Sequence, residues 1–138
     1  MKITKLLLVL KPIIFRIAFI SWLMFVTFSS LSSFEGVDVS YINIPHFDKI
    51  VHFGFYFVMV VLGVFAFDEQ FKNRFGPQKG LIFMLIFAIA YGVIIEVLQA
   101  GFTANRQGDV LDAIANTLGA LSGMWIGKSL FSNRWPLK

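Results

Sequence analysis

The chain contains no cysteine, and charged residues make up only 14% of it. Without cysteine there is no disulfide framework, no thiolate metal site and no cysteine nucleophile. The sequence also lacks the H-E-x-x-H zinc motif, the nucleophile elbow and the glycine-rich phosphate loop. The function must therefore be sought in residues outside these common enzyme signatures.

Hydrophobic residues make up 57% of the 138 residues, which is far above their share in a soluble globular domain. They gather in four runs, each close to the ~20 residues that a helix needs to cross the hydrocarbon core. The sequence therefore predicts an all-α integral membrane bundle of four transmembrane helices. We place the spans at about residues 13–31, 50–67, 81–98 and 110–130.

Basic segments flank the predicted bundle. We expect a basic N-terminal segment at residues 1–12, a transmembrane domain at 13–131 and a basic tail at 132–138. Pro12 is expected to open the first helix, and residues 68–80 are expected to form a loop with a Gly-Pro turn signal. A cleaved signal peptide is the rival interpretation of the N-terminus, but the apolar run is long and no A-x-A site follows it.

The basic residues are distributed unevenly between the two predicted membrane faces. Ten of the 12 lysine and arginine residues fall on one side, and only Lys49 and Arg106 fall on the other. By the positive-inside rule, both termini and the loop at 68–80 are expected to be cytoplasmic. This rule also accounts for the net charge of +4, so we expect no nucleic-acid partner.

Polar residues interrupt the runs near the predicted outer face. Gly92, Glu96 and Gln99 stand at i, i+4 and i+7, and Asp48, His52 and Tyr56 stand at i, i+4 and i+8. A further stripe at i, i+3, i+7, i+10 and i+14 comprises Asp109, Asp112, Asn116, Gly119 and Gly123. Each set lies on one face of a helix. Ionisable groups in membrane helices are costly and mark functional sites.

These stripes predict an outward-facing pocket between the second, third and fourth helices. Its candidate binding residues are Asp48, Lys49, His52, Tyr56, Glu96, Gln99, Arg106, Asp109, Asp112 and Asn116.

Each candidate also has a structural interpretation. Asp109 is a plausible helix N-cap, and Arg106 is placed to pair with Glu96 or Asp112. The side chains suited to interhelical hydrogen bonds are Tyr56, Gln99 and Asn116. Glycines at 119, 123 and 127 are expected to serve helix packing whatever the function.

Two blocks of these residues resemble the VanZ-like family of small bacterial membrane proteins. The first is Asp48-Lys49-x-x-His52-Phe53-x-x-Tyr56. The second is Glu96-x-x-Gln99 followed by Arg106-x-x-Asp109-x-x-Asp112-x-x-x-Asn116-x-x-Gly119-x-x-x-Gly123. Together they cover about residues 46–123. The resemblance implies a bacterial cytoplasmic (inner) membrane protein of the cell envelope, in a family named for low-level resistance to the glycopeptide teicoplanin.

Three functions compete for this site. The first is binding of a lipid or cell-wall precursor headgroup, for which Lys49 and Arg106 offer donors. The second is a membrane enzyme acting on a lipid-linked substrate, with His52 and Glu96 as an acid-base pair. A proton-coupled transporter is disfavoured, because no inverted repeat is visible.

We expect no cofactor, and a divalent metal ion is an alternative within the enzyme hypothesis. Its candidate ligands are His52, Glu96, Asp109 and Asp112.

Overall fold

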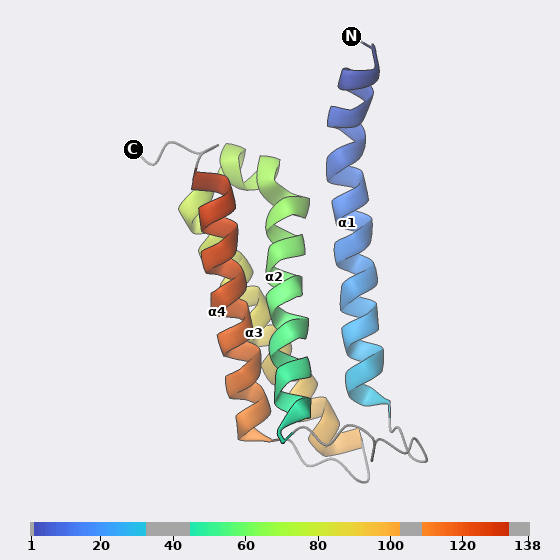
Figure 1. The fold of residues 1–138 in the computed structure, drawn as a ribbon, viewed down its shortest axis with the longest axis vertical. Helices are drawn as coiled ribbons and strands as arrows, with labels where there is room; N and C mark the ends of the chain where they lie inside the picture. The colour runs from blue at the N-terminus through green and yellow to red at the C-terminus, as the bar shows by residue number, and fades with distance from the viewer. Residues whose placement is uncertain (1, 33–44, 103–108, 133–138) are drawn as a thin grey trace.

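The computed structural model describes residues 2–32, 45–102 and 109–132, and these form four α-helices (Figure 1). They are α1 (Lys2–Leu31), α2 (Phe47–Arg74), α3 (Pro77–Phe102) and α4 (Val110–Ser132). The prediction of an all-α chain with four helices is confirmed. Within the described residues, three segments are long and apolar enough to span a membrane: Val9–Leu31, Phe47–Arg74 and Pro77–Phe102. α4 is not among them, because Asp112, Asn116 and its glycines lower its hydropathy.

The helices extend beyond the predicted spans. α1 begins at Lys2, so the prediction that Pro12 opens this helix is wrong and the proline lies inside it. The loop expected at 68–80 is also wrong, because only Phe75 and Gly76 separate α2 from α3. A helix forms the hydrogen bonds of its backbone N–H and C=O groups internally. It can therefore continue beyond the apolar part of its sequence into polar surroundings. Gly76 makes the sharp turn with a φ of 78°, a conformation that favours glycine.

The helices are arranged so that one end of the bundle collects the start of α2, the end of α3 and the start of α4 (Figure 1). The first residues of α1 and the last residues of α4 lie at the opposite end. α4 packs most extensively on α2, whereas α1 packs on α2 and α3 and does not contact α4 within the described residues. α1 is therefore peripheral, and α2 is the central helix.

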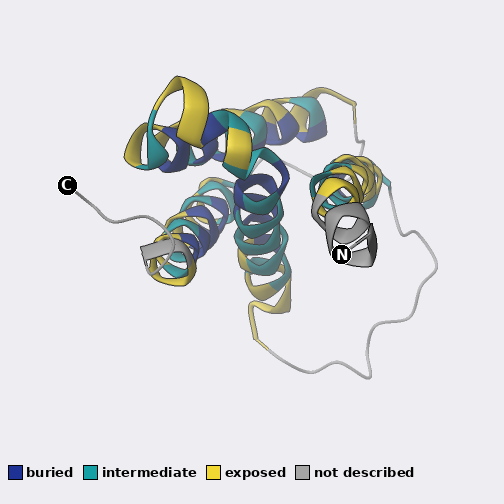
Figure 2. Cartoon of the chain, turned by 90° about the horizontal axis from the view of Figure 1, so that it is seen from above, coloured by how far each residue is buried: buried dark blue, intermediate teal, exposed yellow. Residues whose placement is uncertain are grey.

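The buried residues lie on the sides of the helices that face one another, and the exposed residues lie on the outward sides (Figure 2). Val26, Met59, Val60 and Met84 are almost fully buried, whereas large apolar residues on the outward sides of α1 and α3, such as Phe28 and Ile86, are exposed, as expected for helices that contact lipid.

Polar contacts fix the peripheral α1 to its neighbours. Trp22 Nε1 donates to the Phe55 carbonyl at 2.9 Å, and the Tyr91 hydroxyl donates to the Leu23 carbonyl at 3.0 Å and also contacts Thr27 Oγ1. α1 is thus held to both α2 and α3 by hydrogen bonds that span helices.

Two glycines let α4 approach the backbone of α2. A Cβ atom at Gly119 would lie 2.1 Å from the Phe53 carbonyl oxygen, and one at Gly123 would lie 2.7 Å from that of Phe57. These distances are too short for any other residue without a shift of the backbone. The expected packing role of Gly119 and Gly123 is therefore confirmed, whereas a Cβ atom at Gly127 would make only ordinary contacts, 3.6 Å from Leu81 and Val64. The close approach determines how near the polar residues of α4 come to α2.

Gly119→Ala is expected to lower the stability of the bundle by about 1–3 kcal/mol, because the added methyl group forces α4 away from α2. Thermal unfolding in detergent measures the effect. Gly54→Ala is the matched control, since a Cβ atom there meets nothing within 4 Å; it should leave stability unchanged or raise it by up to about 1 kcal/mol. Equal melting temperatures for the two variants would contradict the close approach.

Candidate functional site

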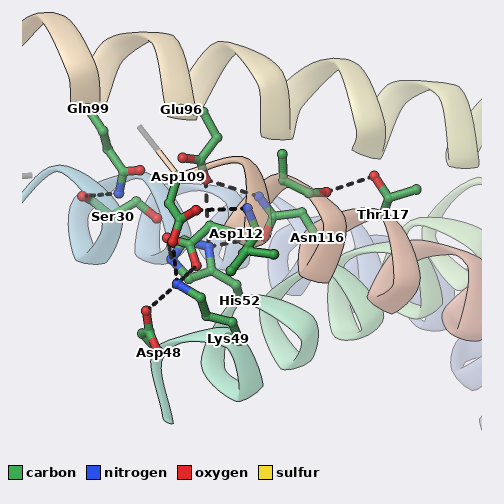
Figure 3. Close-up of polar contacts among 12 residues, drawn as sticks. Ser30, Asp48, Lys49, His52, Glu96, Gln99, Asp109, Asp112, Asn116 and Thr117 are labelled. Atoms are coloured by element: carbon green, nitrogen blue, oxygen red, sulfur yellow. Dashed lines mark hydrogen bonds and ion pairs between the residues drawn. The ribbon is translucent and has the colours of Figure 1, made fainter. Parts of the chain in front are cut away.

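Polar side chains from three helices converge at the end of the bundle where α2 and α4 begin (Figure 3). Lys49 and His52 come from α2, Glu96 comes from α3, and Asp112 and Asn116 come from α4. His52, Glu96 and Asn116 are only 7%, 9% and 2% exposed. The predicted stripes therefore face one another, and they bring ionisable groups together in a buried place.

Asn116 links the other two buried polar residues. Its Nδ2 donates to Glu96 Oε1 at 3.3 Å, and its Oδ1 lies 3.0 Å from His52 Nδ1. An amide oxygen only accepts, so His52 Nδ1 carries the hydrogen of this bond. In the neutral ring, Nε2 then holds the lone pair. Nε2 lies 3.8 Å from Asp112 Oδ2, so the free side of the ring faces a carboxylate.

Lys49 neutralises part of the acidic surroundings. Its ammonium lies 2.7 Å from Asp48 Oδ2, 2.6 Å from Asp109 Oδ2 and 2.8 Å from Asp112 Oδ1. The ammonium donates hydrogen bonds to Asp48 and Asp109, whereas Asp112 Oδ1 forms an ion pair with it and has no hydrogen-bond partner within the described residues. Two of the three ammonium hydrogens are thus engaged, and an anionic ligand approaching the third would meet the charge of Asp112.

Asp109 has two roles at the start of α4. Its Oδ1 accepts a hydrogen bond from the Leu111 backbone N–H at 2.9 Å, which confirms the expected N-cap. Its Oδ2 pairs with Lys49. The ammonium of Lys49 and the Leu111 N–H together hold the pKa of Asp109 below its ordinary value.

The remaining predicted residues lie apart from this cluster. Gln99 Nε2 donates to the Ser30 carbonyl at 2.7 Å, so it joins α3 to α1. The Tyr56 hydroxyl is buried and has no hydrogen-bond partner within the described residues, so the interhelical hydrogen bond expected for it is absent there. Arg106, and with it the expected pairing to Glu96 or Asp112, lies outside the described residues.

Sequence reasoning missed the contributions of α1 to these contacts. The Ser30 carbonyl accepts a hydrogen bond from Gln99 of α3, and the Thr27 hydroxyl contacts the hydroxyl of Tyr91 of α3. A backbone carbonyl leaves no mark in a sequence. Thr27, a polar residue inside an apolar run, was the one available signal, with Tyr91 as its partner.

The cluster is rich in groups that accept hydrogen bonds or bind cations. Among the described residues the cluster holds four carboxylates and one ammonium, and His52 adds a nitrogen ligand or a base. Donor atoms of His52, Glu96 and Asp112 all lie within 4.8 Å of one another, so these three residues form the group of described residues that could hold a metal ion.

Asp109→Asn is expected to lower stability at neutral pH, because asparagine keeps the N-cap but removes the charge facing Lys49. A group with a lowered pKa stabilises the fold above the pKa of the unfolded chain, about 3.9 for aspartate. This stabilisation is lost as the pH falls through the lower folded-state pKa. The difference in melting temperature between wild type and variant should therefore be constant at neutral pH and vanish in acid. A difference independent of pH would contradict the ion pair.

Comparison with known proteins complements this geometry. No curated protein and no solved structure matches the chain. Among protein families, residues 5–132 match VanZ/LLP1. The matched residues include nearly all of α1 and the whole of α2, α3 and α4, so they contain every helical residue of the polar cluster. This chain therefore belongs to the VanZ/LLP1 family.

Proposed function

We propose that this protein binds the polar headgroup of a lipid or of a lipid-linked cell-wall precursor, in a pocket at the outward end of α2, α3 and α4. The observation that carries the proposal is the burial of His52, Glu96 and Asn116 where three helices meet in a membrane protein. Burying ionisable groups at this depth costs free energy that a purely structural bundle avoids with apolar residues. A ligand-binding role would explain why ionisable groups are buried here in spite of this free-energy cost.

The proposal includes a topology. α4 has 23 residues and so is about 34 Å long, which is enough to cross the ~30 Å hydrocarbon core. Its acidic residue lies in its first turn, so the rest of the helix can lie in the membrane. With four crossings, both termini lie on one side, and the excess of lysine and arginine there favours the cytoplasm. The polar cluster then faces outward from the bacterial inner membrane.

Single cysteines test this topology against a cysteine-free background. In intact cells, a membrane-impermeant maleimide is expected to label His46→Cys, beside the polar cluster, and to leave Asn73→Cys, near the turn between α2 and α3, unlabelled. Both positions are exposed in the structure. Permeabilised cells should label both variants, which controls for reactivity. Labelling of Asn73→Cys alone in intact cells would reverse the orientation.

The charge of the cluster restricts the headgroup. Amine and hydroxyl groups can donate directly to Glu96 and Asp112. A phosphate needs positive charge beyond Lys49, whose single charge is already offset by three neighbouring carboxylates. Arg106 remains a proposed source of that charge.

Native mass spectrometry of gently purified protein tests headgroup binding. Wild type is expected to retain a lipid that Glu96→Gln and Asp112→Asn lose by at least about tenfold, since each variant weakens a charged hydrogen bond. Asp68→Asn is the matched control, because this carboxylate pairs with Lys72 near the other end of α2. Equal lipid retention in all four proteins, with equal thermal stability, would refute a headgroup site here.

The family association with glycopeptide resistance extends this proposal to physiology. A protein that binds an envelope headgroup on the outer face is placed to alter how a glycopeptide such as teicoplanin meets its target. We include modulation of teicoplanin susceptibility in the proposal on that ground.

A membrane enzyme acting on a lipid-linked substrate is the second candidate. It is favoured by the proximity of two buried ionisable groups, since His52 Nδ1 and Glu96 Oε1 lie 3.9 Å apart; acid-base catalysis would require this distance to shorten when substrate binds. The lipid recovered in the mass spectrometric experiment separates the two functions. Intact lipid supports binding, whereas a cleaved or transferred headgroup that depends on His52 supports the enzyme.

A further inference from the structure

We propose that His52, Glu96 and Asp112 form a binding site for one divalent metal ion of the zinc or manganese class. The three residues come from α2, α3 and α4, so a bound ion would join the three helices at the outward end of the bundle. The site stands independently of headgroup binding.

The donor atoms are close to the spacing that one ion requires. One atom from each residue lies within 4.8 Å of the other two. In a tetrahedral site, two ligands bonded to one ion at about 2.0–2.2 Å lie about 3.3–3.6 Å apart. Closing the site therefore takes side-chain movements of about 1 Å that draw the three donor atoms together around the ion.

Each of the three ligands has one atom held by a neighbour and another left for the ion. Asn116 forms hydrogen bonds with His52 Nδ1 and Glu96 Oε1, and the Lys49 ammonium forms an ion pair with Asp112 Oδ1 at 2.8 Å without a hydrogen bond. His52 Nε2, Glu96 Oε2 and Asp112 Oδ2 remain. Metal-binding histidines and carboxylates in proteins are oriented by such outer hydrogen bonds. Asn116 and Lys49 thus act as positioning residues.

An unpartnered buried oxygen points independently to a missing ligand. Glu96 Oε2 is inaccessible to solvent and has no hydrogen-bond partner within the described residues. Glu96 as a whole is 9% exposed, so water does not readily reach it. Buried polar atoms are almost always paired, and an unpaired carboxylate oxygen in a membrane protein is especially costly. A cation between Glu96, His52 and Asp112 satisfies this atom.

The ligand set selects the kind of metal. One imidazole with two carboxylates suits zinc or manganese, whereas magnesium and calcium favour oxygen ligands alone and copper(I) favours sulfur. Three protein ligands leave a coordination position open. A phosphate or hydroxyl oxygen of a headgroup can fill it, and the ion would supply the positive charge that Lys49 cannot. This last role rests on the proposed function.

The test uses the full chain in detergent, stripped with a chelator and titrated with Zn²⁺ or Mn²⁺ by calorimetry. Wild type is expected to bind one ion and to melt at a higher temperature when it is bound. His52→Gln, Glu96→Gln and Asp112→Asn should each abolish binding, and Asn116→Ala should weaken it by about 10–100-fold. His46→Gln is the matched control, because His46 is the only other histidine in the chain and is exposed.

Wild type that binds no ion, or a folded His52→Gln variant that binds as wild type does, would overturn the proposal. If the ligand variants do not fold, Mn²⁺ bound to wild type still decides, because electron spin-echo spectroscopy detects an imidazole nitrogen on the ion. A nitrogen signal that survives in His46→Gln supports His52, and its absence from wild type overturns the site. Lipid binding measured with and without the chelator shows separately whether headgroup recognition fails.

Discussion

The hydrogen bonds of Asn116 to His52 and Glu96 are the interaction on which the polar end of the bundle depends. They pair polar groups of α2, α3 and α4 in a place where water cannot pair them. Without Asn116, two buried ionisable side chains would lose their shared partner, and the cost of an unpaired buried group exceeds the gain from forming the bond. These polar groups therefore favour one relative register of the three helices, whereas the packing of apolar side chains alone is compatible with many registers.

Close helix packing and the polar cluster are two consequences of one helical stripe. Gly119 follows Asn116 by three residues, and it lies against the backbone of Phe53, the residue after His52. A larger residue at position 119 would move the polar side chains of α4 away from their partners on α2. The glycine stripe thus sets the distances in the site, although no glycine belongs to it.

The helix periodicity of the sequence was sufficient to predict which faces meet, but not which atoms pair. The stripes through Glu96 and through Asp112 and Asn116 face α2 as expected, because side-chain direction follows from spacing alone. The ends of the helices were not predictable in the same way, since α1 and α2 continue through polar residues that hydropathy treats as loop. Which atoms pair depends on how far each side chain reaches. Lys49 forms ion pairs with Asp48, Asp109 and Asp112. Gln99 donates a hydrogen bond to the Ser30 carbonyl, a partner that no sequence pattern reveals.

The apolar core beneath the cluster argues for a closed site over a conducting path. Beyond Tyr56 the buried residues of α2 have no polar side-chain atom to offer an ion or a proton; they are Met59, Val60, Gly63, Val64, Ala66 and Phe71. Met84 and Ala88 close the same level from α3. In the described part of α1, Arg16 lies deeper still, and its Nε donates to the Ala66 carbonyl. A charge entering beside His52 would meet an apolar layer, and crossing that layer would cost far more free energy than leaving by the end of the bundle where it entered.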